Sequence, residues 1–377
     1  MLLMDILAMA DLVDLLHQCY FRNNISEKYP EALSFLENSI SDLRWNNVIL
    51  YQRALWYLTD KNDRNNAYRE ISKIDIESCD YPEALTLYLD VVPEEISFTD
   101  KQQIIDRIIQ NTTKESYILQ YTTLRGVTFY LIGEVDKGCE IIEFAINHYK
   151  EVAESSRSGY GDFILAQAIT TLGEFRNKKE LINEAIEIYQ REIDKKVYSS
   201  AGIAMLLKSV GDCYLFISNY PTAINYYENS LTKEEKELTK VFLSRALINN
   251  AAITEGRETL KSIKIGKLNV ANKYDYAISW AILAFASLEK NDIETAKSYL
   301  KEANSSDPLF IRQRDKYLIE LLELNPKDEK GKFRKALSKL NRYVTLNLNL
   351  FGIGINFNNI IEDIEIKTKK NNFQQPH

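Results

Sequence analysis

The chain has 377 residues, of which 45% are hydrophobic and 27% charged, as in ordinary folded proteins. Its formal net charge of -7 argues against nucleic-acid binding over the whole surface, because phosphate recognition needs a basic field. With only 13 glycines and seven prolines, the composition favours long helices joined by short connections over strand-and-turn folds.

The N-terminal region, residues 1–118, shows apolar periodicity typical of helices. Its apolar beginning has no basic leader, and Asp5 interrupts it, which indicates an amphipathic first helix rather than a signal peptide. We expect N-terminal helical pairs of degenerate repeats at residues 5–21 with 30–40, 46–58 with 67–74, and 81–91 with 99–109.

One spacing occurs four times between residues 119 and 308. A small residue is followed 12 positions later by a second small residue, and four positions later by a large apolar or aromatic one. Two antiparallel helices approach closely where neither carries a bulky side chain, and the large residue fills the space one turn away. The pattern therefore predicts a helix, a tight turn and a second helix in each of four units: Gly126, Gly138 and Ile142; Gly173, Ala185 and Tyr189; Gly211, Ala223 and Tyr227; Ala284, Ala296 and Leu300.

This arrangement resembles the tetratricopeptide repeat (TPR). The matching residues in the best unit are Trp280, Leu283, Ala284, Ala296, Ala303 and Pro308. A second unit matches through Leu207, Gly211, Tyr214, Ala223 and Tyr227. The resemblance implies an all-α protein, an α-solenoid of antiparallel TPR-like helix pairs wound as a right-handed superhelix. The 73 residues from Gly211 to Ala284 leave room for one degenerate pair, expected at 238–252 and 256–272.

The C-terminal region departs from the repeat. Residues 309–324 and 332–346 are expected to form two helices, and residues 346–358 alternate between apolar residues and Asn or Gly, which is typical of an extended segment. We interpret residues 309–366 as an atypical C-terminal cap over the apolar face of the last repeat. The alternative is a docking edge for another chain. Residues 367–377 are polar and are expected to be a disordered tail.

A basic patch spans residues 330–342, most of it in the helix expected at 332–346. It is interpreted as a solvated helix face, and the alternative is a contact with an acidic partner or a nucleic acid. Its residues are Lys330, Lys332, Arg334, Lys335, Lys339 and Arg342.

No catalytic or metal-binding pattern occurs in the chain. Its three histidines stand in unrelated contexts, and no phosphate-binding loop, nucleophile elbow or zinc-protease motif is present. The four cysteines are far apart, as expected for reduced thiols in the cytoplasm. No apolar stretch reaches the ~20 residues that span a bilayer. We expect no enzyme activity, no cofactor, no metal and no membrane contact.

The resemblance also implies that the first helix of each pair lines a concave groove. Long polar side chains one turn apart on those helices would hold an extended peptide, or else they are merely solvated.

The leading hypothesis is a protein- or peptide-binding scaffold, with a possible homo-oligomer through an array end. Alternatives are a peptide-sensing regulatory receptor that acts through a partner protein, similar to tetratricopeptide quorum-sensing receptors, and a helical nucleic-acid-binding module, which the charge makes the least favoured. The candidate groove residues are Gln167, Thr170, Glu174, Lys208, Asp212, Arg245 and Asn249, with further inward positions at Gln120, Thr123, Val127, Tyr130 and Asn177.

Overall fold

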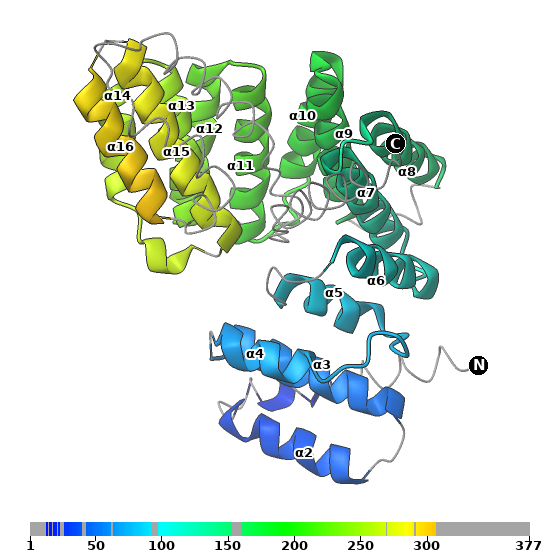
Figure 1. The fold of residues 1–377 in the computed structure, drawn as a ribbon. Coiled ribbons are helices and arrows are strands. Elements are labelled where there is room, and N and C mark those ends of the chain that lie inside the picture. Colours follow the sequence, from blue (N-terminus) through cyan, green and yellow to red (C-terminus); the bar gives the residue numbers. More distant parts are fainter. Residues whose placement is uncertain are drawn as a thin grey trace, which may run out of the picture. The chain divides into compact units, whose positions relative to one another are not determined.

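The structure, a computed structural model, consists of helices and their connections in the part of the chain that it describes (Figure 1). The predicted cap, the basic patch and the tail all lie outside the described residues. The chain divides into two compact units, one within residues 1–125 and one that begins at Gly126. The described part is residues 13–306, apart from residues 14, 17, 21, 23–25, 40–42, 62, 92–96, 153–159, 269 and 290–291.

The first unit contains helices near the ranges expected for 30–40, 46–58, 67–74, 81–91 and 99–109, and most of the helix expected at 5–21 lies outside the described residues. Asp63 begins α4 by accepting a hydrogen bond from the backbone N–H of Asn66 at 3.0 Å, and Ser97 begins α6 in the same way by accepting from Asp100. Arg53 of α3 is bound to Glu37 of α2 at 2.6 Å. The helices are α2 (Tyr29–Ser39), α3 (Leu43–Thr59), α4 (Arg64–Ile71), α5 (Pro82–Val91) and α6 (Phe98–Asn111), with a 3₁₀ turn η1 (Ser26–Lys28) before α2.

The second unit consists of helix pairs, and the chain is therefore a TPR-like α-solenoid, as the sequence predicts. Helix α7 crosses the division between the units, and its residues from Gly126 on belong to the second one. Each pair joins a first helix to a second helix: α7 (Glu115–Leu131) to α8 (Val135–Glu151), α9 (Gly161–Arg176) to α10 (Lys179–Asp194), α11 (Ser200–Phe216) to α12 (Tyr220–Lys233), α13 (Glu237–Asn249) to α14 (Ile253–Lys261), and α15 (Val270–Glu289) to α16 (Ile293–Ser306).

The turns between first and second helices share one backbone conformation. Gly133, Asn177, Ser218 and Ala251 all have positive φ, between 50° and 91°. In each turn the next residue donates its backbone N–H to the carbonyl five residues back; the bond from Lys178 to Gly173, for example, is 2.8 Å long. The residue in the left-handed conformation ends the first helix, and the hydrogen bond satisfies a carbonyl group in its last turn. The chain then reverses direction within a few residues.

Close approach at the small residues explains the repeated spacing. A Cβ atom built on Gly138 would lie 2.6 Å from the carbonyl oxygen of Gly126, and one built on Gly211 would lie 2.7 Å from the ring of Tyr227. These distances are far shorter than ordinary van der Waals contacts. In the last pair Ala284 and Ala296 are both fully buried. The small residues therefore set how closely the two helices of a pair pack.

The degenerate pair follows the same rule, which the sequence analysis missed. Ser244, Gly256 and Leu260 repeat the spacing of 12 and four, and a Cβ on Gly256 would lie 3.0 Å from the carbonyl oxygen of Ser244. The predicted second helix at 256–272 was wrong at its end, because α14 stops at Lys261. A 3₁₀ turn, η3 (Ile265–Lys267), follows, and the buried side chains of Ile263 and Leu268 on either side hold this connection against the core.

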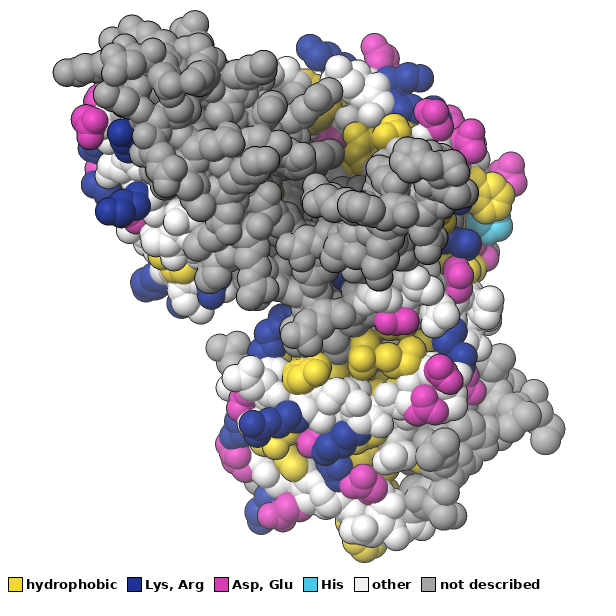
Figure 2. All heavy atoms as spheres, in the orientation of Figure 1, with side chains coloured by type: hydrophobic (Ala, Val, Ile, Leu, Met, Phe, Trp, Pro, Cys, Tyr) yellow, Lys and Arg dark blue, Asp and Glu magenta, His cyan; other side chains and the backbone are white. Residues whose placement is uncertain are grey.

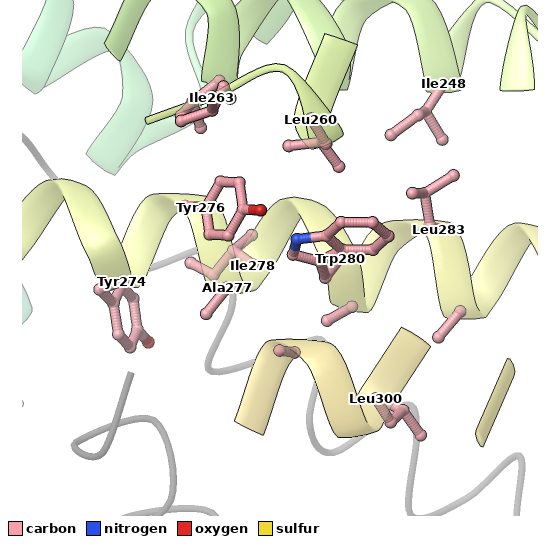
Figure 3. Close-up of a cluster of buried hydrophobic side chains, with 14 of the residues drawn as sticks. Ile248, Leu260, Ile263, Tyr274, Tyr276, Ala277, Ile278, Trp280, Leu283 and Leu300 are labelled. Carbon is pink, nitrogen blue, oxygen red and sulfur yellow. The ribbon is translucent and has the colours of Figure 1, made fainter. Parts of the chain in front are cut away.

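A continuous core joins the last two pairs (Figure 3). Trp280 of α15 lies between the two pairs, edge-on to Tyr276 at 6.1 Å between ring centroids and 5.6 Å from the ring of Tyr299 on α16. Ile248 and Leu260 approach it from α13 and α14 (Figure 3). Each pair thus buries its apolar face against its neighbour, as stacking repeats must.

Candidate functional site

Successive first helices of the second unit touch one another. Helix α9 contacts α11, α11 contacts α13, and α13 contacts α15. The second helices α10, α12 and α14 pack instead against the first helix that follows each of them. The first helices therefore form one layer of the array, and residues on neighbouring first helices meet along shared seams.

A row of charged side chains crosses these seams, and we refer to it as the charged row. Glu174, Asp212 and Arg245 occupy equivalent positions, because each directly follows the small residue of its first helix. The charged row consists of Glu174 on α9, Lys208 and Asp212 on α11, Arg245 on α13 and Asp275 on α15. Four of these five residues are sequence-predicted groove residues.

Asp212 has a partner on each carboxylate oxygen. The ammonium group of Lys208, one helical turn earlier, lies 2.7 Å from Oδ2, and the hydroxyl of Tyr227 donates to Oδ1 at 2.7 Å. Tyr227 is also the large residue that packs on Gly211, so α12 helps to position the carboxylate. A charge-assisted bond of this kind fixes both partners in one geometry.

Arg245 links α13 to α15. Its guanidinium donates to Asp275 Oδ1 at 2.8 Å and to the hydroxyl of Ser279 at 2.9 Å, and it also donates to the carbonyl oxygen of Asp275. Asp275 is only 2% exposed. Burial raises the pKa of this carboxyl group, and the charge and hydrogen bonds of Arg245 oppose the rise.

Phe242 connects the two ion pairs. The Lys208 ammonium lies 4.3 Å from its ring centroid, and the Arg245 guanidinium carbon lies 4.8 Å from the same centroid. Both distances are within the range of cation–π attraction. Lys208 and Arg245 are thus each bound to a carboxylate and to a shared aromatic ring.

Glu174 differs from the other members of the charged row. Within the described part of the chain, the Glu174 carboxyl group forms neither a hydrogen bond nor an ion pair. Burial first, and then the negative charge of Asp212, raise the pKa of Glu174 to about 8, while Lys208 opposes the rise. The charged row contains three carboxyl groups and two cations, and Glu174 is the carboxyl group without a cation of its own.

The other predicted groove residues are placed as follows. Gln167 lies two turns before Glu174 on α9, and its buried Oε1 has no hydrogen-bond partner. Thr170 donates to the carbonyl oxygen of Ala166 at 2.8 Å, and its hydroxyl lies 3.6 Å from the Cys213 sulfur, so it faces the α9–α11 contact. Asn249 is exposed near the end of α13 and is no part of the charged row.

Three of the further inward positions are buried. Gln120 is 8% exposed, and Thr123 and Val127 are fully buried. Tyr130 is half-buried and stacks on Phe175 with ring centroids 3.5 Å apart. Two members of the site escaped the sequence analysis: Asp275 lies nine residues before Ala284, outside the repeated positions, and Phe242 reads as a core residue.

The described residues contain no group of three or more His, Cys, Asp or Glu that could hold a metal ion. Burial raises the pKa of the Cys79 thiol to about 11 and that of Cys213 further, so both remain protonated. Within the described part, no helix is both long and apolar enough to cross a bilayer. Among the described residues on the visible face, Figure 2 shows Lys and Arg side chains interspersed with Asp and Glu rather than gathered in one basic field.

The turns, the small-residue contacts and the stacked pairs define the class of this protein, a TPR-like α-solenoid. No family profile matches the chain, and no curated protein sequence is similar to it. Among solved structures, it is similar to a Rap protein complexed with competence and sporulation factor, at 11% identity over 91% of this chain and 99% of that one, with a TM-score of 0.48. It is also similar to the apo form of RapI, at 13% identity over 90% of this chain and 98% of that one, with a TM-score of 0.43. Likeness of this degree says nothing about a shared ligand.

Proposed function

We propose that this chain is a non-enzymatic, cytoplasmic binding protein that holds a peptide or protein segment against the first helices of its second unit. One observation carries the proposal: on α9, Gln167 Oε1 is buried and has no hydrogen-bond partner, and the Glu174 carboxyl group lies two turns further along the same helix. Buried polar atoms without partners are rare in folded proteins, and a bound donor would satisfy them.

The spacing of these acceptors suits an extended peptide. Gln167 and Glu174 are seven residues apart, which places them on one face of α9 and about 11 Å apart along the helix. Three to four residues of extended chain, at roughly 3.3 Å each, cover this distance. Backbone N–H groups or cationic side chains of such a segment would supply the missing donors.

The remaining members of the charged row are held in place by ion pairs and form a rigid side of the proposed site. Lys208 and Arg245 are already paired with Asp212 and Asp275, so they do not have to be ordered when a ligand binds. Rigid side chains reduce the entropy cost of association. This pairing also means that the two cations are poor candidates for direct anion capture, and it favours the acceptors of α9 as the point of ligand contact.

Two alternative functions make different experimental predictions. A peptide-sensing regulatory receptor would use the same acceptors, and peptide binding would in addition change the capture of a partner protein. A nucleic-acid-binding module would instead depend on the basic patch around Lys335 and Lys339, which lies outside the described residues. Possible self-association through an array end would show itself in the oligomeric state of the free chain.

The experiment is selection of binding peptides from a random displayed library on the wild-type chain, followed by affinity measurements on variants. We expect Gln167→Ala combined with Glu174→Gln to weaken the selected peptides at least tenfold, about 1.4 kcal/mol. Glu187→Gln, on the exposed side of α10, is the matched control and should leave affinity unchanged. Loss of binding on reversal of Lys335 and Lys339 to Glu, with the α9 variant silent, would assign binding to the C-terminal segment and contradict the proposal.

A further inference from the structure

The outer side of α8 differs from the outer sides of the other second helices. The side chain of Phe144 on α8 is 69% exposed, and it lies six residues after Gly138, the small residue of its helix. The equivalent positions of the other four pairs are exposed and polar: Arg191, Asn229, Ser262 and Glu302. The exposed aromatic ring is therefore a property of α8 rather than of the repeat.

Phe144 is the centre of a row of exposed side chains, which we call the α8 stripe. The other members lie four and seven residues before and after it, so all of them share one face of the helix. The α8 stripe consists of Lys137, Glu140, Phe144, His148 and Glu151. The ring of His148 stacks on Phe144 with centroids 6.3 Å apart, so the middle of the stripe is aromatic and its ends are charged.

The α8 stripe is complementary to itself when its direction is reversed. Lys137 and Glu151 lie equally far before and after Phe144 and carry opposite charges. Glu140 and His148 also lie equally far on either side of it, and a carboxylate accepts a hydrogen bond from an imidazole N–H. A second α8 that runs antiparallel, with the two Phe144 rings in contact, therefore brings unlike groups together at all four outer positions. A parallel arrangement would instead place each charge opposite its own copy.

The charged ends of the α8 stripe are available for such a contact. In the described part of the chain, neither Glu140 nor Glu151 forms an ion pair. Lys137 lies 3.0 Å from Glu134 and 4.0 Å from the ring centroid of Phe129, but at least half of each charged side chain is exposed. Exposed ion pairs of this kind contribute little to stability, so a carboxylate of a second copy can share or replace the contact with Lys137.

We propose that the α8 stripe binds a second copy of this chain, in an antiparallel pair of α8 helices related by a two-fold axis. In a two-fold contact residue i meets residue j while j meets i, and the pairing of Lys137 with Glu151 and of Glu140 with His148 meets this condition. The two Phe144 rings remove each other from water at the centre, and the charged pairs fix the register. One pair of helices buries less than the roughly 1,600 Å² of a standard interface, so the dimer dissociates on dilution.

The proposed dimer contact is separate from the contacts inside the array. The buried side of α8 packs on α7, where Gly138 approaches Gly126, and α8 also contacts α9. The α8 stripe uses none of these residues and none of those assigned to ligand binding on α9. The dimer is therefore independent of the proposed function, and each copy keeps its own first helices for a ligand.

Analytical ultracentrifugation of the full chain over a range of concentrations measures the dimer. We expect the wild type to pass from monomer to dimer, and Phe144→Ser to weaken the dimer about tenfold or more, because the central apolar contact is lost. Asn229→Ser, at the equivalent exposed position of α12, is the matched control and should leave the dissociation constant unchanged. A wild-type chain that stays monomeric up to about 1 mM overturns the proposal. Association that survives Phe144→Ser, as a contact through an array end would, overturns it as well.

Charge reversals test the antiparallel register. Lys137→Glu and Glu151→Lys each place like charges opposite each other in a dimer of identical copies, so each alone should weaken the dimer about tenfold. A mixture of the two variants places unlike charges opposite each other at both ends and should recover nearly the wild-type affinity. Both positions are exposed, so melting temperatures should stay at the wild-type value. A mixture that associates no better than either variant alone would contradict the antiparallel pairing.

Discussion

The contacts inside each helix pair and the seams between successive first helices are built from different chemistry. Inside a pair, small residues bring two backbones together, as at Gly126 and Gly138, where an added Cβ would lie 2.6–2.7 Å from main-chain atoms. At the seams, charged side chains such as Lys208 and Arg245 form ion pairs and share the ring of Phe242. Packing sets the first kind of contact, and electrostatics tunes the second.

The two kinds of contact should respond differently to their environment. A close-packed apolar contact is insensitive to pH and salt, and it tolerates almost no added volume. A seam that contains an excess carboxyl group responds to protons and to bound donors. Under the proposed function, the contacts within the pairs keep the array rigid, and the seams between the pairs adapt to the ligand.

The largest expected effect breaks a contact inside a pair. Ala296→Glu would place a charge against the fully buried Ala284, and we expect a loss of about 3 kcal/mol or more in the free energy of unfolding. Chemical denaturation followed by circular dichroism measures it. Ser298→Glu, on the same helix but away from this contact, should cost far less. Equal stability of the two variants would mean that the repeat register is wrong.

A smaller loss is expected at the seam between α13 and α15. Arg245→Ala removes the cation from the buried Asp275, and we expect a loss of about 2 kcal/mol at neutral pH. The loss should shrink in acid, where Asp275 takes up a proton and no longer needs a counter-charge. Arg257→Ala removes an arginine whose ion-pair partner is exposed and should change stability by less than about 0.5 kcal/mol. A pH-independent loss for Arg245→Ala would argue against the role given to the ion pair.

The smallest effect is a gain, at a turn. Ala251 has φ of 64°, a conformation that costs an L-residue roughly 1 kcal/mol and a glycine almost nothing. Ala251→Gly should therefore raise the melting temperature slightly, although glycine loses more entropy on folding. Ala252→Gly is the matched control, since Ala252 has a negative φ of -81° and should lose stability. The opposite ranking of the two variants would show that this turn carries no strain.

The sequence predicted the contacts inside the pairs well, because they depend on residue size at fixed spacing. Gly211, Ala223 and Tyr227 can be found from the sequence, since a larger residue at Gly211 would collide with the tyrosine ring. The Ser244 and Gly256 contact obeys the same rule, with serine as the small residue of the first helix. The shortened helix α14 was not predictable from local pattern, because it ends where Ile263 and Leu268 enter the core.

The seams were predicted in part. The sequence analysis grouped Glu174, Lys208, Asp212 and Arg245 as groove residues, but the sequence could not show that the cations were already paired with carboxylates. Asp275 lies one helix pair beyond Arg245, and only the packing of α13 on α15 brings the two together. The folded structure decides which carboxyl group is left without a cation, because the pairing depends on distances between helices. The spacing of residues along the chain does not give these distances.

The central claim is that the layer of first helices holds one excess carboxyl group at Glu174, and the pH dependence of stability tests this claim most directly. The folded-state pKa is raised to about 8 from an ordinary value of 4.5, so the fold disfavours the ionised form. Wild-type stability should therefore fall between about pH 4.5 and pH 8 relative to Glu174→Gln, and the difference should level off above that range. A total change on the order of 3 kcal/mol is expected, since one pKa unit corresponds to about 1.4 kcal/mol and the half-buried side chain keeps some contact with water. A constant stability difference between wild type and Glu174→Gln from pH 5 to pH 9 would contradict the account.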